Sequence, residues 1–188
     1  MKALIFVMIS LFVFGCEKSS PILYERDPKW KIADEIYDNE IGKKVFLQLK
    51  REKKLKVIES GWGLRGRKNI RCMHCGFQYF NEITLDEARE LLVEAANLYL
   101  KTINENERIP PFLENYPFGP ENIEIRIFIY DSKGKNPSKE KLQYITLQDG
   151  KFRYSTGELD SQGLFKDICV ETYEEAQSKL LAIMNTNR

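Results

Sequence analysis

The sequence is short of the residues and motifs from which most catalytic sites are built. It holds one histidine, His74, and four cysteines among its 188 residues. The motifs GxSxG, HExxH, GKS and GKT, which mark hydrolases and phosphate-binding loops, do not occur. Carboxylates are plentiful, but no pair stands out from the charged helix faces. These absences favour a protein that is not an enzyme, and we expect no cofactor.

Internal repeats, low-complexity tracts and long apolar runs are also missing. The longest apolar stretch, residues 3–14, is shorter than the ~20 residues that a stable membrane-spanning helix needs. Lys2 precedes it, so residues 1–15 are predicted to be a secretory signal peptide. The whole chain is 43% hydrophobic and 30% charged, which is typical of a globular domain of this length.

The end of the apolar stretch resembles a bacterial lipobox. Residues 13–16 read VFGC, with the small glycine and the cysteine that the pattern requires. The resemblance implies that Cys16 is lipidated, becomes the first residue of the mature protein and is held permanently by several acyl chains. Phe14 departs from the pattern, because that position usually holds a smaller residue, and an uncleaved anchor is the alternative. Glu17, which is not aspartate, implies sorting to the outer membrane, facing the periplasm.

The remaining chain is predicted to be a tether, residues 16–32, and one α+β domain, residues 33–188. We expect an antiparallel sheet of four to five strands, packed by two main helices and joined by an additional N-terminal amphipathic helix. Apolar residues at helical spacing and two capping boxes, Thr84–Glu87 and Thr172–Glu175, indicate the helices. The three helices are expected at residues 34–54, 84–106 and 172–186.

Alternating isoleucines mark the clearest strand, and Asp149-Gly150 predicts a type I′ hairpin. Residues 61–66, GWGLRG, instead predict a flexible glycine turn that places Trp62 against the core. The strands are expected near residues 70–80, 122–130, 142–148, 151–155 and 166–170.

Two cysteines and the histidine lie together in RCMHCG, residues 71–76. A thiol-redox CxxC opens a helix whose dipole stabilises the thiolate, but the residues after Cys75 alternate as in a strand. Strand residues three apart point to opposite faces, which argues against a bond between Cys72 and Cys75. Cys75 is then expected to be a small apolar core residue, and a redox pair is the alternative.

With Cys16 lipidated, three cysteines remain, an odd number. A disulfide from Cys169 to Cys72 or Cys75 is a further alternative, which an exported protein would permit. Together with His74, the three thiols would also be suitable zinc ligands. The opposed faces of the predicted strand argue against their convergence, so we expect no metal site.

Basic residues are concentrated in one part of the chain. Residues 43–71 contain eleven lysines and arginines against two acids, whereas residues 76–130 contain ten acids against four bases. The two segments either lie together and neutralise each other, or the basic one contacts anionic lipid headgroups. Nucleic acid is not an expected partner of an exported chain. The candidate residues for contact with an anionic surface are Lys50, Arg51, Lys53, Lys54, Arg65, Arg67 and Lys68.

The run from Ile83 to Phe128 resembles a group of uncharacterised secreted or lipid-anchored proteins of intracellular Gram-negative bacteria. It includes ITLDEARELLVEAANLYLKTINENERI, then NYPF and NIEIRIF. The resemblance implies an order of helix, loop and strand and an exported setting, and it implies no site residue.

Three hypotheses for function follow from these observations. The first is a non-enzymatic module, anchored through Cys16, that binds an unknown protein partner at a bacterial membrane surface. The second is a periplasmic thiol-redox protein that uses Cys72 and Cys75. The third is a small-ligand carrier beside the aromatic loop of residues 106–120.

Overall fold

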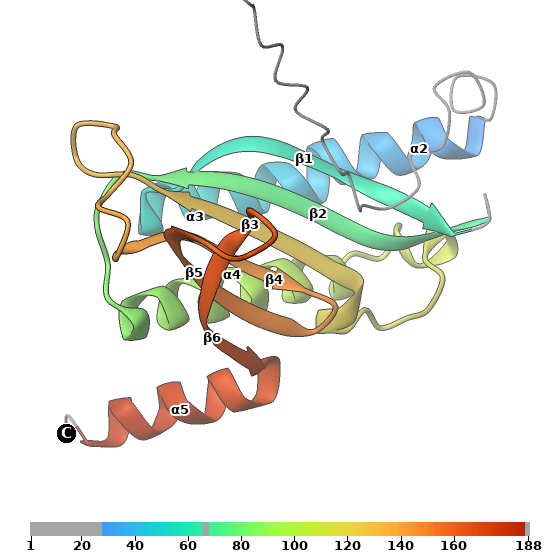
Figure 1. Cartoon of the computed structure of the whole chain (residues 1–188). Coiled ribbons are helices and arrows are strands. Elements are labelled where there is room, and N and C mark those ends of the chain that lie inside the picture. The colour runs from blue at the N-terminus through green and yellow to red at the C-terminus, as the bar shows by residue number, and fades with distance from the viewer. Residues whose placement is uncertain (1–27, 66–67, 187–188) are drawn as a thin grey trace, which may run out of the picture.

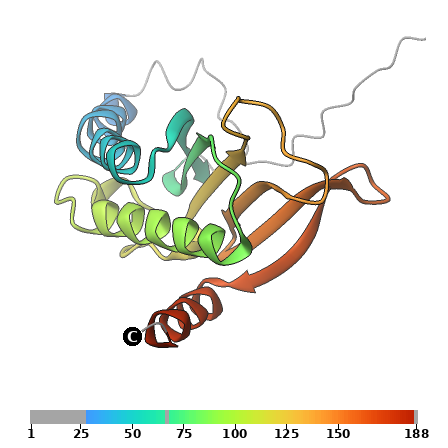
Figure 2. The same cartoon turned by 90° about the vertical axis from the view of Figure 1, so that its left-hand side faces the viewer.

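The computed structural model describes residues 28–65 and 68–186, and the structural statements below concern those residues. The predicted signal peptide, Cys16, most of the predicted tether and Arg67 lie outside them. The described chain forms one sheet with its helices gathered on a single face (Figure 1, Figure 2). The α+β class predicted from the sequence is confirmed.

The sheet has six strands, which lie in the order of the sequence. Neighbouring strands are antiparallel except for β2 and β3, which are parallel. The expectation of a purely antiparallel sheet of four to five strands is therefore wrong. Parallel neighbours need a long crossover, and helix α4 supplies it between β2 and β3. The strands are β1 Lys56–Arg65, β2 Asn69–Tyr79, β3 Ile123–Ile129, β4 Leu142–Gln148, β5 Lys151–Leu159 and β6 Phe165–Thr172.

Strand β1 occupies residues that the sequence pattern does not mark as a strand. The predicted glycine turn is wrong, because Gly61 pairs with His74 in the ladder between β1 and β2. A Cβ atom at position 61 would lie 3.0 Å from His74 Cε1, so any larger residue here would require the His74 ring to shift by a few tenths of an ångström. Trp62 does pack inward, with its ring centroid 5.2 Å from that of Trp30.

The N-terminal helix spans residues 28–53 and is longer than predicted. It consists of α2 (Pro28–Ile36), a π-helical segment η1 (Tyr37–Gly42) and α3 (Lys43–Lys53). Pro28 suits a first helical position because its missing N–H would have no partner there. Residues 28–32, assigned to the tether from the sequence, therefore belong to the helix.

The Tyr37 hydroxyl fixes this helix to the rest of the fold from inside the core. It donates to the backbone carbonyl of His74 (3.0 Å), accepts from the N–H of Gly61 (3.1 Å) and lies 3.0 Å from the Tyr99 hydroxyl. Both tyrosine side chains are almost fully buried. A buried hydroxyl with several partners has its hydrogen-bonding capacity satisfied. These bonds fix the positions of η1, β1, β2 and α4 relative to one another.

The local signals at helix and hairpin ends are confirmed. At the start of α4 (Leu85–Asn104), the Glu87 carboxylate accepts from the Thr84 N–H (2.7 Å) and the Glu87 N–H donates to the Thr84 hydroxyl (3.3 Å). Thr172 and Glu175 make the same reciprocal pair at the start of α5 (Tyr173–Thr186). In the β4–β5 hairpin, Asp149 and Gly150 both have positive φ, 49° and 71°, as a type I′ turn requires.

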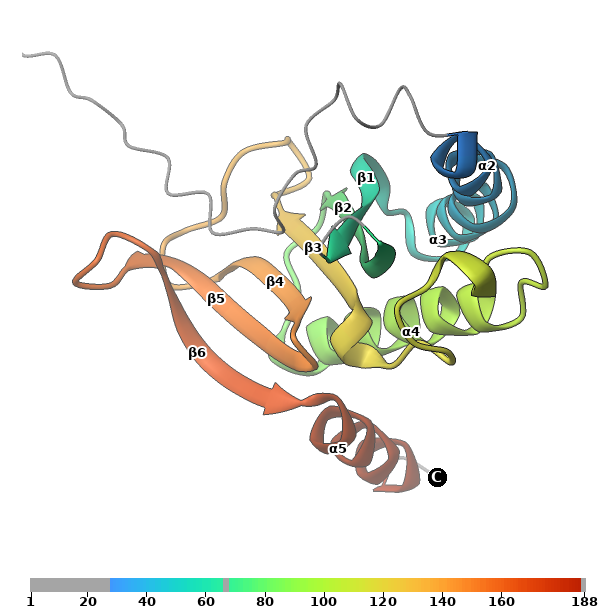
Figure 3. The ribbon, with the colours of Figure 1, turned by 90° about the vertical axis from the view of Figure 1, so that its right-hand side faces the viewer.

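The core lies between the sheet and the helices. In β3, Ile123, Ile125, Ile127 and Ile129 are buried, and the alternate residues face away from the helices. In Figure 3 the described helices all lie on one side of the sheet. Strands β1 and β6 are its outer strands, and each pairs with one neighbouring strand among the described residues.

A buried ion cluster holds β6 at its edge. In β6, all of whose residues the structure describes, Glu171 is the only buried one. Its carboxylate accepts from Arg89 Nε of α4 (2.7 Å) and from Lys179 Nζ of α5 (2.7 Å). Arg89 also pairs with Asp86 and lies over the Tyr154 ring of β5. One carboxylate thus joins α4, β6 and α5.

We predict that Glu171→Gln lowers the free energy of unfolding by about 3 kcal/mol, because it removes the buried counter-charge of the Arg89 guanidinium and leaves only the solvent-exposed Asp86. Asp86→Asn is the matched control, since the Asp86 side chain is 65% exposed and its loss should cost less than about 1 kcal/mol. Urea denaturation of both variants measures the difference. Equal losses would show that Glu171 does not hold this cluster.

The same carboxylate makes stability depend on pH. Burial alone would raise the pKa of Glu171, but hydrogen bonds from Arg89 and Lys179 outweigh it and hold the pKa below its usual value. Its contribution is present above the unfolded pKa of about 4.3 and is lost as pH falls through the lower folded pKa. Urea denaturation at a series of pH values between 6 and 2 measures the free energy of unfolding. As pH falls over this range, that free energy should decrease more steeply for the native sequence than for Glu171→Gln.

Candidate functional site

The Cys72 and Cys75 thiols lie on opposite faces of β2 and do not form a disulfide with each other. Cys75 faces the core between Met73 and Phe77 and is 1% exposed, as the strand interpretation predicts. Burial is the main cause that raises the pKa of Cys75 well above its ordinary value, and the nearby charge of Glu59 raises it further. A thiol in this setting is unreactive, because the thiolate is the nucleophile.

The fold does not bring Cys169 to either of them. Cys169 is a free thiol in β6, four strand spacings from β2, or about 19 Å in an extended sheet. A disulfide needs a Cα separation near 5.5 Å. Among the described residues, no group of three or more histidines, cysteines or acidic residues is arranged to hold a metal ion.

The predicted basic residues form two separate groups. Lys50, Arg51, Lys53 and Lys54 lie at the end of the N-terminal helix, before β1 begins. Arg65 and Lys68 lie at the other end of β1, ten residues or about 33 Å away. They do not make one continuous surface.

Two of these basic side chains are also neutralised. Lys53 pairs with Glu94 of α4, which belongs to the acidic segment of the sequence, and Arg51 pairs with Glu52 at 2.7 Å. For Lys53, the structure therefore favours neutralisation by the acidic segment over contact with lipid.

The outer strand β6 carries several apolar side chains that are exposed to solvent. Phe165 is 40% exposed, Ile168 is 51% exposed and Val170 is 47% exposed. Among the described residues, β6 pairs only with β5, so within that part of the chain its other edge has unpaired backbone groups. Bulges interrupt the pairing near Ser155, and there the Ser155 hydroxyl donates to the Asp167 carboxylate at 2.7 Å. Edges of this kind are where other chains add to a sheet.

A hollow of about 400 Å³, which we call the β6 hollow, adjoins this edge on the helix side. Its apolar part comes from the start of α4, the start of β4 and the middle of β6, and acidic side chains surround it. The lining residues are Glu82, Ile83, Thr84, Leu85, Glu87, Glu140, Lys141, Leu142 and Ile168.

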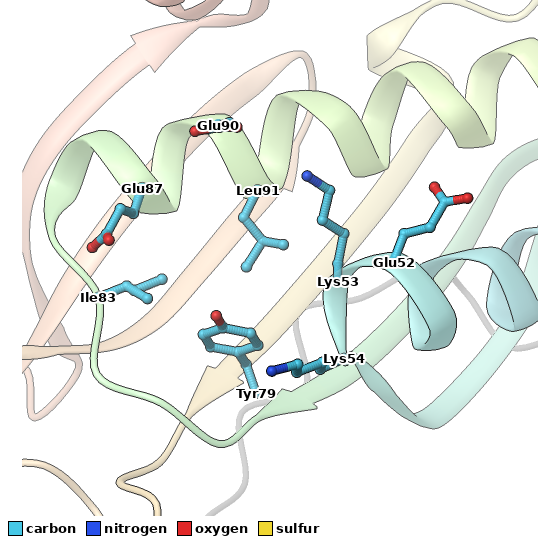
Figure 4. Close-up of a pocket in the computed structure, with 8 residues that line it drawn as sticks. All are labelled: Glu52, Lys53, Lys54, Tyr79, Ile83, Glu87, Glu90 and Leu91. Carbon is cyan, nitrogen blue, oxygen red and sulfur yellow. The ribbon is translucent and has the colours of Figure 1, made fainter.

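A second hollow of about 250 Å³, the α3–α4 hollow, shares Ile83 and Glu87 with the first. Figure 4 shows Tyr79 and Leu91 between the end of α3 and the first turns of α4, with Lys53 and Lys54 on the α3 side. Because the two hollows share residues, they form one surface that runs along the start of α4 to the β6 edge.

Sequence reasoning identified the strand at 166–170 but none of its exposed side chains as site residues. The available signal is that Phe165, Ile168 and Val170 are apolar without strict alternation, next to charged neighbours. That pattern does not reveal exposure, because which strand forms the edge depends on the topology.

None of the known proteins used for comparison resembles this chain: no family model, curated protein or solved structure matches it. Among the described helices, none combines the length and apolarity needed to cross a lipid bilayer.

We predict that the thiols differ in reactivity in the native protein. Iodoacetamide should modify Cys72 and Cys169, which are partly exposed, and should leave Cys75 unmodified until the protein is unfolded. Peptide mass spectrometry after labelling, with and without urea, measures this difference. A native disulfide between Cys72 and Cys75 would contradict the arrangement of β2.

Proposed function

We propose that the protein is a lipid-anchored, non-enzymatic interaction module that binds a partner protein at a bacterial membrane surface through the open edge of β6. The observation that carries this proposal is a set of three exposed apolar side chains on β6: Ile168 beside the β6 hollow, and Phe165 and Val170 on the helix-free face. Large apolar side chains on an unpaired edge are an aggregation hazard for an isolated domain, and a binding partner is the usual reason to retain them.

Strand addition is the mode of binding that this geometry supports. An extended segment that pairs with β6 would gain main-chain hydrogen bonds from the edge. Its alternate side chains would then face either the β6 hollow, beside Ile168, or the helix-free face, beside Val170. A pocket next to a free edge gives such binding its specificity.

The anchor would keep this edge close to the bilayer. Cys16 is separated from the start of α2 at Pro28 by eleven residues. Fully extended, they reach at most about 40 Å. A domain on so short a tether meets membrane-associated partners at a high local concentration.

The thiol-redox and ligand-carrier hypotheses have less support. Cys75 is buried on the opposite face from Cys72, which does not suit a dithiol centre. In the aromatic loop, Phe112 and Phe118 are buried in the core, and the Tyr116 hydroxyl donates to the carbonyl of Asn104 at 2.7 Å. These side chains serve to pack the loop.

The anchor predicts a defined processing event. Globomycin, which blocks lipoprotein signal peptidase, should cause an unprocessed precursor to accumulate, and Cys16→Ser should release the protein from the membrane fraction. Immunoblots of membrane and soluble fractions measure both effects. Mature-sized, membrane-bound Cys16→Ser protein would rule out the anchor.

The edge predicts position-specific crosslinking in cells. A photo-crosslinking amino acid at Val170 of the anchored protein should give a discrete adduct, which Ile168→Asp abolishes. Leu47→Asp is the matched control, because Leu47 is an exposed leucine on α3, 59% exposed, and should leave the adduct unchanged. Gel mobility and mass spectrometry identify the adduct, and its persistence in Ile168→Asp would contradict binding at this edge.

A further inference from the structure

The charges on β6 itself are already paired within the chain. Lys166 pairs with Glu158 at 2.7 Å, and Asp167 pairs with Arg153 at 2.8 Å. Glu171 is held in the buried ion cluster. A partner that lies along β6 therefore gains little from the charges of the strand, and any charge preference must come from the hollow beside it.

The rim of the β6 hollow has an excess of negative charge. It contains Glu82, Glu87, Glu140 and Lys141, and Lys141 is paired with Glu82. The Glu87 carboxylate accepts from the N–H and hydroxyl of Thr84, at 2.7 Å and 2.9 Å. These donors are neutral, so they orient the carboxylate without cancelling its charge.

The Glu87 and Glu140 carboxylates, for which the described part of the chain shows no ion pair within 4 Å, are ionised at neutral pH. Hydrogen bonds from the Thr84 backbone and side chain hold the pKa of Glu87 below its ordinary value. A hydrogen bond from its own backbone N–H, followed by one from the Ser138 side chain, does the same for the pKa of Glu140. The hollow thus combines an apolar floor of Ile83, Leu142 and Ile168 with a fixed negative rim.

We infer that the partner segment bound at β6 is an extended stretch in which apolar residues alternate with lysine or arginine. This inference rests on the proposed function. The aliphatic stems of the basic side chains would cover the floor beside Ile168, and their charged ends would reach Glu87 and Glu140. Apolar side chains on the other side of the segment would meet Val170 and Phe165 on the helix-free face.

A second copy of this chain fits less well. The charges of its β6 would already be paired within its own chain, as described above, and so would bring no excess of positive charge to the acidic rim. The charge balance therefore favours a basic segment from a different protein.

Two synthetic peptides test this inference with the full mature chain. One alternates valine with lysine and the other alternates valine with glutamate, so their apolar content and strand propensity are matched. Fluorescence anisotropy should show that the lysine peptide binds at least about tenfold more tightly and that added salt weakens it. Ile168→Asp changes the floor of the hollow, and its effect on binding of the lysine peptide shows whether the peptide occupies this site.

Charge reversal at the rim supplies the decisive variant. Glu140→Lys should weaken binding of the lysine peptide about two- to fivefold and strengthen binding of the glutamate peptide. Glu105→Lys is the matched control, because Glu105 is an exposed glutamate at the other end of α4, where it pairs with Lys101, and it should change neither.

The outcomes separate this inference from the proposed function. Equal binding of the two peptides, or an unchanged affinity in Glu140→Lys, overturns the inference that the partner segment is basic. The proposed binding at the β6 edge is then tested separately by crosslinking in cells. Binding that is insensitive to Ile168→Asp overturns the site assignment. Dimerisation that depends on Ile168, measured by sedimentation, would assign the edge to a second copy instead.

Discussion

The position of the outer strand depends on one buried carboxylate. Glu171 is the single buried side chain of β6, and it accepts from Arg89 of α4 and Lys179 of α5. The rest of β6 is bound to β5, through a backbone ladder that bulges interrupt and through the ion pairs of Lys166 and Asp167. An ion cluster can fix a strand without burying its apolar residues, and this leaves Ile168 and Val170 exposed to solvent. The candidate site therefore exists because β6 is held in place mainly by ion pairs and backbone hydrogen bonds, and only to a small extent by apolar packing.

The one-sided arrangement of the fold explains where binding can occur. All the described helices lie on one face of the sheet, so no described helix covers the opposite face. The outer strands β1 and β6 each pair with one neighbouring strand among the described residues. The start of α4 lies beside the edge and supplies the acidic rim and part of the apolar floor of the β6 hollow. The site combines the edge backbone of β6 with an apolar floor and a negative rim. The residues of the floor and rim come from the start of α4, the start of β4 and from β6, which are distant in sequence and meet only in the folded domain.

Local structure was predictable where a few neighbouring residues decide it. The capping boxes at Thr84 and Thr172, the Asp149-Gly150 hairpin and the alternating strand from Ile123 are all present in the structure. The burial of Cys75 also followed from its strand. In contrast, β1 shows no alternation of apolar and polar residues, and it contains charged residues and two glycines. Its position depends on contacts with His74 and Tyr37, which are distant in sequence.

By itself, the sequence determined the α+β class, the ends of two helices and the opposed faces of Cys72 and Cys75, because propensity, capping and strand periodicity act over a few residues. Only the tertiary structure decided that β2 and β3 are parallel, that β6 is an edge, and that Lys54 and Lys68 lie at opposite ends of β1. These features depend on which segments pair across long stretches of chain. Such pairing is set by the summed burial and hydrogen bonding of the whole core, and no short motif encodes it.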